Sequence, residues 1–314
     1  MGKFISTRVA YGETLCEIGA DENIVAFDAD LTICTMSCYF AAKYPGRFIN
    51  AGIAEANMIG MSAGVATTGK TVFCHSFAMF TAGRGYDQIR NSIAYPELNV
   101  KVVGTHAGLS VGEDGATHQC IEDLSLMRTI PNMTVICPAD ANETKMAVRA
   151  MAVYKGPCYL RLGRSAVENV TDEVPGYQFV IGKGVLLSEG TDITIIATGL
   201  MVQVALQAAK ELALQGISAR VVDMHTIKPI DREIIIESAK LTGAIVTAEE
   251  HNIIGGLGSA VMEVVGEECP VPVIRLGVND VFGHSGTAEA LMLKYELTAE
   301  NLINKVKLAI SKKS

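Results

Sequence analysis

The stretch that decides the fold is residues 50–66, N-A-G-I-A-E-A-N-M-I-G-M-S-A-G-V-A, in a chain of 314 residues. A small turn with Asn50 and Gly52 leads into an apolar segment that we predict to be a helix over 54–66. Glu55 is the only charged side chain in this segment and stands in its first turn, where the helix dipole favours a carboxylate. Apolar surroundings would remove water from the carboxyl group and favour a form that holds or donates a proton. Most first-turn acids are structural, so Glu55 alone leaves both interpretations open.

Short apolar strands alternate with helices on both sides of this segment. We expect strands over 24–27, 71–74, 100–104, 134–137 and 158–162, and further helices over 7–19, 85–95, 119–127 and 141–153. Such alternation is typical of a parallel sheet that is covered on both faces. The sequence therefore predicts a first α/β domain over 1–166.

A polar stretch with the turn signal Pro175-Gly176 interrupts this pattern, and we predict a linker over 167–189. A second α/β domain is expected over 190–314. Its predicted strands are 193–198, 219–223, 244–249 and 271–276, and its helices are 202–215, 231–240, 257–265, 287–294 and 298–312. The predicted fold class is two consecutive three-layer α/β domains with mainly parallel sheets. The second domain carries few reactive clusters, so we expect it to act as scaffold and interface.

Composition limits the possible partners and the compartment. The net charge is −8 and no basic tract stands out, which argues against a nucleic acid or an anionic membrane as partner. No apolar run reaches the roughly 18 residues that span a bilayer, and the Met1 end has no apolar signal region. Eight cysteines without a C-x-x-C pair read as reduced thiols. These features predict a cytoplasmic protein.

Three patterns suggest sites that we reject. Residues 64–71 match G-x-x-x-x-G-K-T, but the expected order is helix before strand, the reverse of a phosphate-binding loop. Gly256-Leu-Gly258 is half of a dinucleotide fingerprint and is interpreted as a turn before a helix. The histidines and acids of residues 106–118 lack the spacing that places two metal ligands on one helix face, so we predict no metal site in this chain.

Three further stretches of the first domain carry chemistry. In C-H-S-F-A-M-F, Phe77 and Phe80 are either core or a stacking pocket for a flat heterocycle. Residues 104–119, G-T-H-A-G-L-S-V-G-E-D-G-A-T-H-Q, hold two His, two acids and four Gly directly after a strand, where α/β sheets bind ligands. Of Arg161 and Arg164, we interpret one as a surface charge and the other as a phosphate ligand.

In these residues, the chain resembles the C-terminal half of a transketolase. The matching segments are N-A-G-I-A-E, S-F-A-M-F followed by R-G-Y-D-Q-I-R, and T-H-A-G-L-S-V-G-E-D-G-A-T-H-Q, in the order of the pyrimidine-binding domain of that family. The second half resembles the transketolase C-terminal domain, so the resemblance covers essentially the whole chain. The G-E-D-G-x-T-H-Q element is specific, whereas the glutamate and the aromatic residues are shared more widely among thiamine diphosphate enzymes.

The resemblance implies transfer of a two-carbon ketol unit between sugar phosphates with thiamine diphosphate as cofactor. Glu55 would hydrogen-bond the aminopyrimidine and drive it to the imino tautomer that deprotonates the thiazolium carbon, a task that needs a desolvated carboxyl group. Phe80, together with Phe77, would stack on the pyrimidine. Asp30, in the loop D-A-D-L-T, would approach the cofactor.

The same resemblance implies roles towards the substrate. His106 would meet the sugar phosphate, and Asp114 would bind a sugar hydroxyl. His118 would contact the reacting hydroxyketone end of the sugar, as a second catalytic residue beside the glutamate. Arg8 and Arg164 would clamp the substrate phosphate.

The sequence departs from the family in three places. The stretch 80–86 is one residue longer than in many transketolases, so we assign no role to Tyr86, and the serine usual after D-L-x-P is not recognisable around Cys34. The family's G-D-G…N motif, which binds diphosphate and Mg²⁺, is absent. We therefore predict a split transketolase in which an N-terminal partner subunit binds the diphosphate with Mg²⁺ or Ca²⁺, in an α2β2 assembly.

Two related enzymes and one binding module are the alternatives. A 1-deoxyxylulose-5-phosphate synthase shares G-x-D-G-x-T-H-Q but usually lacks a histidine at the place of His106. The β subunit of a 2-oxoacid dehydrogenase lacks the loop. A non-catalytic binding subunit would keep the fold and lose the chemistry, which the intact Glu55, His106, Asp114 and His118 argue against. On these residues, transketolase is the preferred function.

Overall fold

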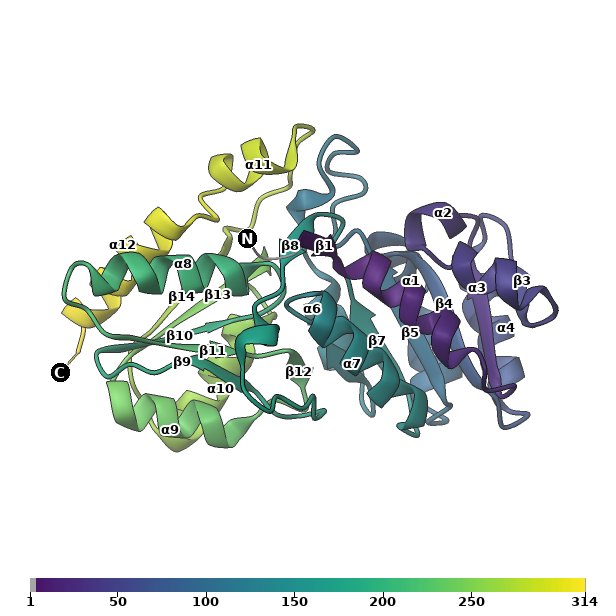
Figure 1. Cartoon of the computed structure of the whole chain (residues 1–314), viewed down its shortest axis with the longest axis horizontal. Coiled ribbons are helices and arrows are strands. Elements are labelled where there is room, and N and C mark those ends of the chain that lie inside the picture. Colours follow the sequence, from purple (N-terminus) through teal and green to yellow (C-terminus); the bar gives the residue numbers. More distant parts are fainter. Residues whose placement is uncertain (1–3, 314) are drawn as a thin grey trace.

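The computed structural model describes residues 4–313 and has two α/β domains side by side (Figure 1). The first domain runs from purple to blue-green in Figure 1 and the second from green to yellow, each around its own sheet. The predicted fold class is confirmed. Within the described residues, no helix is long and apolar enough to cross a membrane. The first residues of the Met1 end, used above to predict the compartment, lie outside this range.

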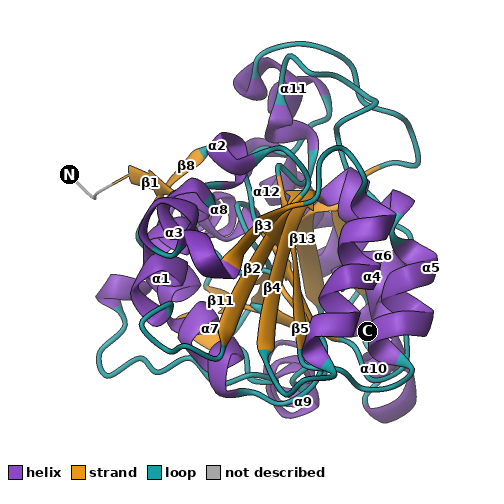
Figure 2. Ribbon diagram, turned by 90° about the vertical axis from the view of Figure 1, so that its right-hand side faces the viewer, coloured by secondary structure: helices purple, strands orange, loops and turns teal. Residues whose placement is uncertain are grey.

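The first domain is built on a seven-stranded sheet in the order β12-β6-β7-β5-β4-β2-β3. Its strands are β2 Ile24–Asp28, β3 Phe48–Asn50, β4 Thr71–Phe77, β5 Val100–Thr105, β6 Thr134–Ile136, β7 Cys158–Arg161 and β12 Thr226–Lys228. All neighbours pair in parallel except β12, which the second half of the chain contributes antiparallel to β6. Figure 2 shows helices on both faces of this sheet, as its continuous apolar strands require.

The helices of this domain match most predicted positions. They are α1 Thr7–Ile18, α2 Thr32–Thr35, α3 Cys38–Lys43, α4 Glu55–Ala66, α5 Tyr86–Gln88, α6 Asp123–Thr129 and α7 Ala141–Val153. The helix expected over 119–127 begins only at Asp123, because the Gln119 amide is used to bind carbonyls of the preceding loop and of His284. Strand β4 extends to Phe77, three residues beyond its predicted end.

The segment predicted as a helix over 85–95 has an unusual backbone. α5 is flanked by two π-helical segments, Met79–Arg84 and Ile89–Ala94. A π-turn accommodates one extra residue in a helix and is frequent at functional sites. The first segment therefore gives a structural reason for the additional residue noted in the stretch 80–86.

The second domain contains a five-stranded sheet in the order β14-β13-β10-β11-β9. The strands are β9 Val185–Ser188, β10 Ile193–Ala197, β11 Ala219–Asp223, β13 Ile245–Asn252 and β14 Val273–Val278, and only β9 is antiparallel to its neighbour. The helices are α8 Met201–Ala213, α9 Arg232–Thr242, α10 Leu257–Glu268, α11 Ala288–Lys294 and α12 Ala299–Ser311. A separate antiparallel pair, β1 Phe4–Ser6 and β8 Ala166–Glu168, lies where the two domains join. The exact domain boundaries stay a prediction.

A buried group of acids lies between the domains. Glu143, in α7, accepts hydrogen bonds from the Tyr177 hydroxyl at 2.5 Å and from the Ala139 amide at 2.7 Å. The Asp223 carboxylate, at the end of β11, is fully buried beside Glu143 and accepts no donor within the described residues. Burial raises the pKa of Glu143 to about 7 and that of Asp223 well above its usual range, and the neighbouring Glu143 carboxyl raises the pKa of Asp223 further. The pair therefore holds a proton near neutral pH.

This pair predicts a pH-dependent effect of Asp223→Asn on stability. The folded pKa of Glu143 lies above its ordinary 4.5, so the stability that the protonated pair contributes is complete below about pH 4.5 and lost as pH rises through about 7. Asparagine at position 223 cannot ionise, so the variant should lose less stability than the wild type as pH rises. Compared with the wild type, the variant should gain about 1–3 kcal/mol in free energy of unfolding between about pH 5 and pH 8, measured in urea.

The matched control is Asp172→Asn, which removes an exposed acid of the same chemistry. Its free energy of unfolding should lack the gain between about pH 5 and pH 8 that is expected of Asp223→Asn. A constant difference for Asp223→Asn would contradict the shared proton.

Candidate active site

The candidate site lies at the carboxyl ends of neighbouring parallel strands. In the sheet register Asp28 pairs with His75, Phe77 with Thr105, and Gly104 with Arg161, so β2, β4, β5 and β7 end at one edge. Ligands of parallel α/β sheets bind outside this edge. The segments that follow these strands carry Asp30, Phe80, His106 and Arg164, as predicted from the sequence.

Four predicted site residues form one aromatic cluster. The Phe77 ring lies 4.0 Å from the His106 ring and 5.8 Å from the Phe80 ring, measured between centroids and close to parallel in both cases. The His118 ring meets Phe80 edge-on at 5.2 Å. Phe77 is buried whereas Phe80 is half-buried, so one ring belongs to the core and the other is open to a ligand. The burial of Phe77 fits the core interpretation, and stacking of either ring on a heterocycle stays a prediction.

Glu55 is the first residue of α4 and is buried, with 4% of its surface exposed. Its carboxylate accepts a hydrogen bond from the Arg84 guanidinium at 3.1 Å. The guanidinium carbon of Arg84 lies 4.2 Å from the centroid of the Phe80 ring. Arg84 thus joins the acid to the aromatic cluster. No role was predicted for Arg84 from the sequence. Its spacing of four residues from Phe80 on a helical segment was a usable signal for contact between the two side chains.

A group of cations lies beside His106. Arg8, in α1, donates to the Cys34 carbonyl at 2.7 Å, while its buried Nε has no acceptor within residues 4–313. Arg164 donates to the Val111 carbonyl and forms an ion pair with exposed Glu113 at 3.3 Å. Burial, followed by the charges of Arg8 and Arg164, lowers the pKa of His106 to about 3, so its imidazole is neutral at physiological pH. The group has positive charge and an unused donor, which suit an anion.

Arg161 does not have either of the two roles weighed for it. Its side chain is 6% exposed and donates to the Asp123 carboxylate at 2.9 Å. It also donates to the carbonyls of Cys120 and Glu250. The interpretation of one of the two arginines as a surface charge is wrong, because Arg161 is buried and Arg164 remains the candidate for phosphate.

The loop 104–119 is fixed by hydrogen bonds to the second domain. The Glu250 carboxylate, in β13, accepts the Ser110 amide at 2.5 Å and the Ser110 hydroxyl at 3.2 Å. A Cβ on Gly108, whose φ is +83°, would lie 2.3 Å from the Glu250 carboxyl carbon, so only glycine fits there. His106 also has a positive φ of 57°, which is uncommon outside glycine and clusters at functional sites. The adjacent acids Glu249 and Glu250, inside β13, were a usable signal for this contact that the sequence-based prediction did not include.

Two predicted residues stand apart from these contacts. Asp30 is exposed, with a φ of 65°, and accepts a hydrogen bond from the Asn50 amide at 3.0 Å. Asp114 is exposed in the loop 104–119. Their roles towards cofactor and sugar stay predictions.

The rejected patterns have other structural explanations. The stretch 64–71 connects the end of α4 to the start of β4, as expected, and Lys70 donates to the Glu22 carbonyl. At Gly256 the helix α10 begins, and the Glu249 carboxylate accepts its first amides, those of Leu257 and Gly258. No group of three metal-ligating side chains occurs among the residues that the structure describes.

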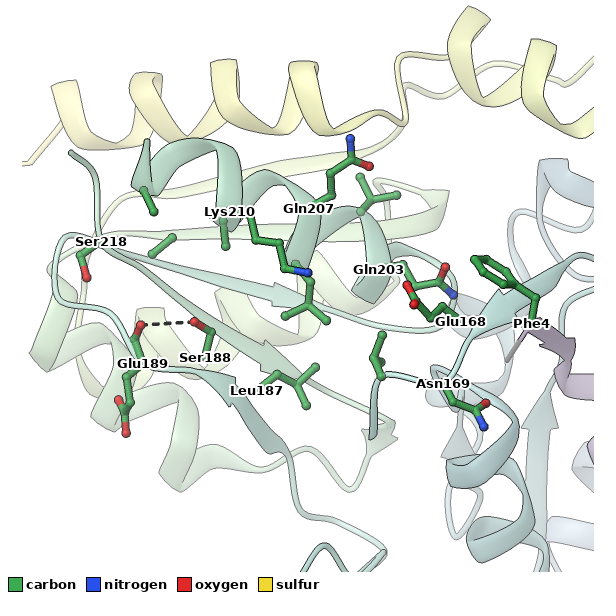
Figure 3. Close-up of a pocket in the computed structure, with 16 residues that line it drawn as sticks. Phe4, Glu168, Asn169, Leu187, Ser188, Glu189, Gln203, Gln207, Lys210 and Ser218 are labelled. Atoms are coloured by element: carbon green, nitrogen blue, oxygen red, sulfur yellow. Dashed lines mark hydrogen bonds between the residues drawn. The ribbon is translucent and has the colours of Figure 1, made fainter. Parts of the chain in front are cut away.

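Two hollows differ in their relation to this site. Figure 3 shows one of about 770 Å³ where the domains join, between β8, β9 and α8, with Phe4, Gln203 and Lys210 in its walls. It contains none of the predicted site residues. A second, of about 470 Å³, is lined by Phe80, Arg84 and Thr117 together with Phe282 of the second domain. Among the residues that the structure describes, Phe80 is the predicted site residue that lines this second hollow.

Comparison with known proteins agrees with this arrangement. Residues 3–169 match the family described as Transketolase, pyrimidine binding domain, and residues 182–302 match Transketolase, C-terminal domain. A solved structure titled "Split gene transketolase, inactive beta4 tetramer" is similar with a TM-score of 0.92 and 54% identity, covering 99% of this chain and 100% of the other.

Two relatives match along nearly their whole length. The "Putative transketolase C-terminal section" of Methanocaldococcus jannaschii is 51% identical, covering 97% of this chain and 96% of the relative. A 6-deoxy-6-sulfo-D-fructose transketolase subunit of a Clostridium species is 47% identical, covering 94% and 92%. The chain therefore belongs to the transketolase family, as a pyrimidine-binding domain followed by the family's C-terminal domain.

Proposed function

We propose that this chain is one subunit of a thiamine-diphosphate-dependent transketolase, which transfers a two-carbon ketol unit between sugar phosphates. The observation that carries the proposal is that Phe80 contacts His118 directly and is linked to Glu55 through Arg84, at the carboxyl edge of the sheet. Thiamine diphosphate, when bound, supplies a carbon nucleophile and an electron sink for the two-carbon unit.

The residues present fit the aminopyrimidine part of this cofactor. Glu55 offers a buried carboxyl group that can hold or give a proton to a ring nitrogen. Phe80 offers a half-buried ring for stacking, with Phe77 behind it. Glu55 would therefore orient the ring and move its proton, and the phenylalanines would exclude water from that exchange.

The cation group fits the phosphate end of the substrate. The free Nε of Arg8 and the half-exposed Arg164 supply donors and charge, whereas neutral His106 supplies a hydrogen bond without charge. His118, at the edge of Phe80, would contact the hydroxyketone end of the sugar. Asp114 would bind a hydroxyl and Asp30 would approach the cofactor.

The relatives support a partner subunit. One is named a C-terminal section and another a subunit, and this chain matches both along nearly their whole length. We infer an N-terminal partner that binds the diphosphate and Mg²⁺ or Ca²⁺, with the active site at the interface of an α2β2 assembly in the cytoplasm. The similar structure titled an inactive β4 tetramer is consistent with a C-terminal half that needs this partner.

The alternatives differ in substrate. A synthase of the 1-deoxyxylulose-5-phosphate type or a 2-oxoacid dehydrogenase would consume pyruvate or another 2-oxoacid. The proposal of a sugar-phosphate enzyme is supported by His106, which stacks on Phe77 at 4.0 Å in the aromatic cluster and which the synthase usually lacks. Assay of the complex with xylulose-5-phosphate and ribose-5-phosphate against pyruvate decides between them.

The first prediction from this proposal concerns Glu55. Glu55→Gln should lower turnover of the reconstituted complex by about 10²- to 10⁴-fold, because the amide cannot exchange a proton with the pyrimidine. The measurement is ketol transfer between sugar phosphates with thiamine diphosphate and Mg²⁺. Unchanged turnover of this variant would instead support a non-catalytic binding subunit.

The second prediction concerns assembly. The chain alone should show no ketol transfer under these conditions, and activity should appear in proportion to added partner chain until the two are equimolar. Activity of the chain alone would contradict the split site, whatever the effect of the glutamine variant.

The third prediction concerns the phosphate. Arg164→Gln should raise the KM for a phosphorylated ketose roughly 10- to 100-fold, because it removes a charge-assisted hydrogen bond. The KM for a ketose without phosphate should stay unchanged. Arg149→Gln is the control, since Arg149 pairs on the surface with Glu17. An equal rise for both ketoses would show that Arg164 supports the loop rather than the phosphate.

A further inference from the structure

Arg84 makes contact with both residues to which the proposed function assigns the aminopyrimidine. Its guanidinium donates to Glu55 at 3.1 Å and covers the Phe80 ring at 4.2 Å. These are one edge contact to a carboxylate and one face contact to an aromatic ring. An aminopyrimidine held by Glu55 and Phe80 would use the same two contacts.

The chemistry of the guanidinium explains why it can take this place. It is planar, carries N–H donors along its edge and stacks on aromatic faces. An aminopyrimidine is also planar, with a donor and acceptor edge and a π face. Both groups cannot use the same Glu55 oxygen and the same face of Phe80 at once.

The backbone places Arg84 for this contact. It is the last residue of the π-helical segment Met79–Arg84, and Gly85 follows it. A Cβ on Gly85 would lie 2.0 Å from the Ile59 side chain of α4, the helix that begins with Glu55. The glycine therefore lets the segment pack closely against the helix that carries the acid.

The contact between Arg84 and Glu55 stabilises the buried carboxylate, and another partner of that carboxylate can replace Arg84. A carboxylate as buried as Glu55 costs free energy when it has no partner. The Arg84 side chain is 55% exposed, so it can leave for solvent at small cost. An ion pair with one buried and one exposed member suits a replaceable partner better than a permanent one.

We propose that Arg84 occupies the place of the aminopyrimidine in the cofactor-free chain, positions Glu55 and Phe80 there, and is displaced when thiamine diphosphate binds. The inference rests on the proposed function. Arg84 is thus a positioning residue that competes with the cofactor.

Direct binding to the assembled complex tests this competition. Thiamine diphosphate is titrated calorimetrically into the complex of this chain with its partner, in Mg²⁺, for the wild type, Arg84→Ala and Arg84→Lys. Because it removes the competitor, Arg84→Ala should lower the Kd about threefold to tenfold. Arg84→Lys keeps the charge without the flat fork and should lie between the two.

Arg90→Ala is the matched control, because Arg90 is exposed in the second π-helical segment, Ile89–Ala94, and its side chain bonds only its neighbour Asn91 among the described residues. Its Kd should equal that of the wild type. A weaker or unchanged Kd for Arg84→Ala would overturn the inference, since Arg84 would then belong to the loaded site or contribute nothing.

Melting temperatures provide a second readout. Arg84→Ala should melt below the wild type without cofactor, and the difference should disappear at saturating thiamine diphosphate. A difference that persists with cofactor would show a permanent structural role and contradict displacement. If the wild-type complex itself binds no thiamine diphosphate, the proposed function fails and the inference fails with it, whereas binding without tightening refutes the inference alone.

Discussion

The architecture of the site depends on the buried ion pair between Arg161 and Asp123. Arg161 ends β7, Asp123 begins α6, and the Tyr159 hydroxyl also donates to the carboxylate. Its Nη2 donates to the carbonyls of Cys120 and Glu250, so a single side chain ties the sheet, the residue that follows the loop 104–119 and the second domain together. Loss of one partner from such a pair leaves a buried charge, which typically costs about 3–5 kcal/mol. The loop that presents His106 is thus fixed by the interior of the protein, and the second domain is part of the site.

The sequence was sufficient for the layers of the fold, whereas the roles that it assigned to the site residues stay predictions. Apolar strands alternating with helices predicted both sheets. The structure brings Phe77, His106 and His118 together because parallel strands end at one edge. The start of α6 was missed because glutamine at 119 serves the loop through its side chain, which helix propensity does not register. The order of the strands, the transfer of β12 to the first sheet and the burial of Arg161 arise from contacts distant in sequence. No local pattern contains them.

Glu55 illustrates the same limit. Its position at the start of an apolar helix indicated a desolvated acid, and the structure buries it as expected. Its partner Arg84 lies 29 residues away and reaches it from the π-helical segment Met79–Arg84, which precedes the helix predicted over 85–95. The half-site on this chain is therefore more than a cavity that could accept a ring. It is a pair of ligand-binding groups held in place by an exposed guanidinium, with the second half of the site expected from another chain.

The most direct test of this account is a crystal structure of the complex of this chain with its partner subunit and thiamine diphosphate. The account predicts the pyrimidine on the face of Phe80 with its edge at Glu55, the Arg84 guanidinium moved away from both, and the diphosphate on the partner subunit. A pyrimidine bound elsewhere while Arg84 still pairs with Glu55, or a diphosphate held by this chain alone, would contradict it.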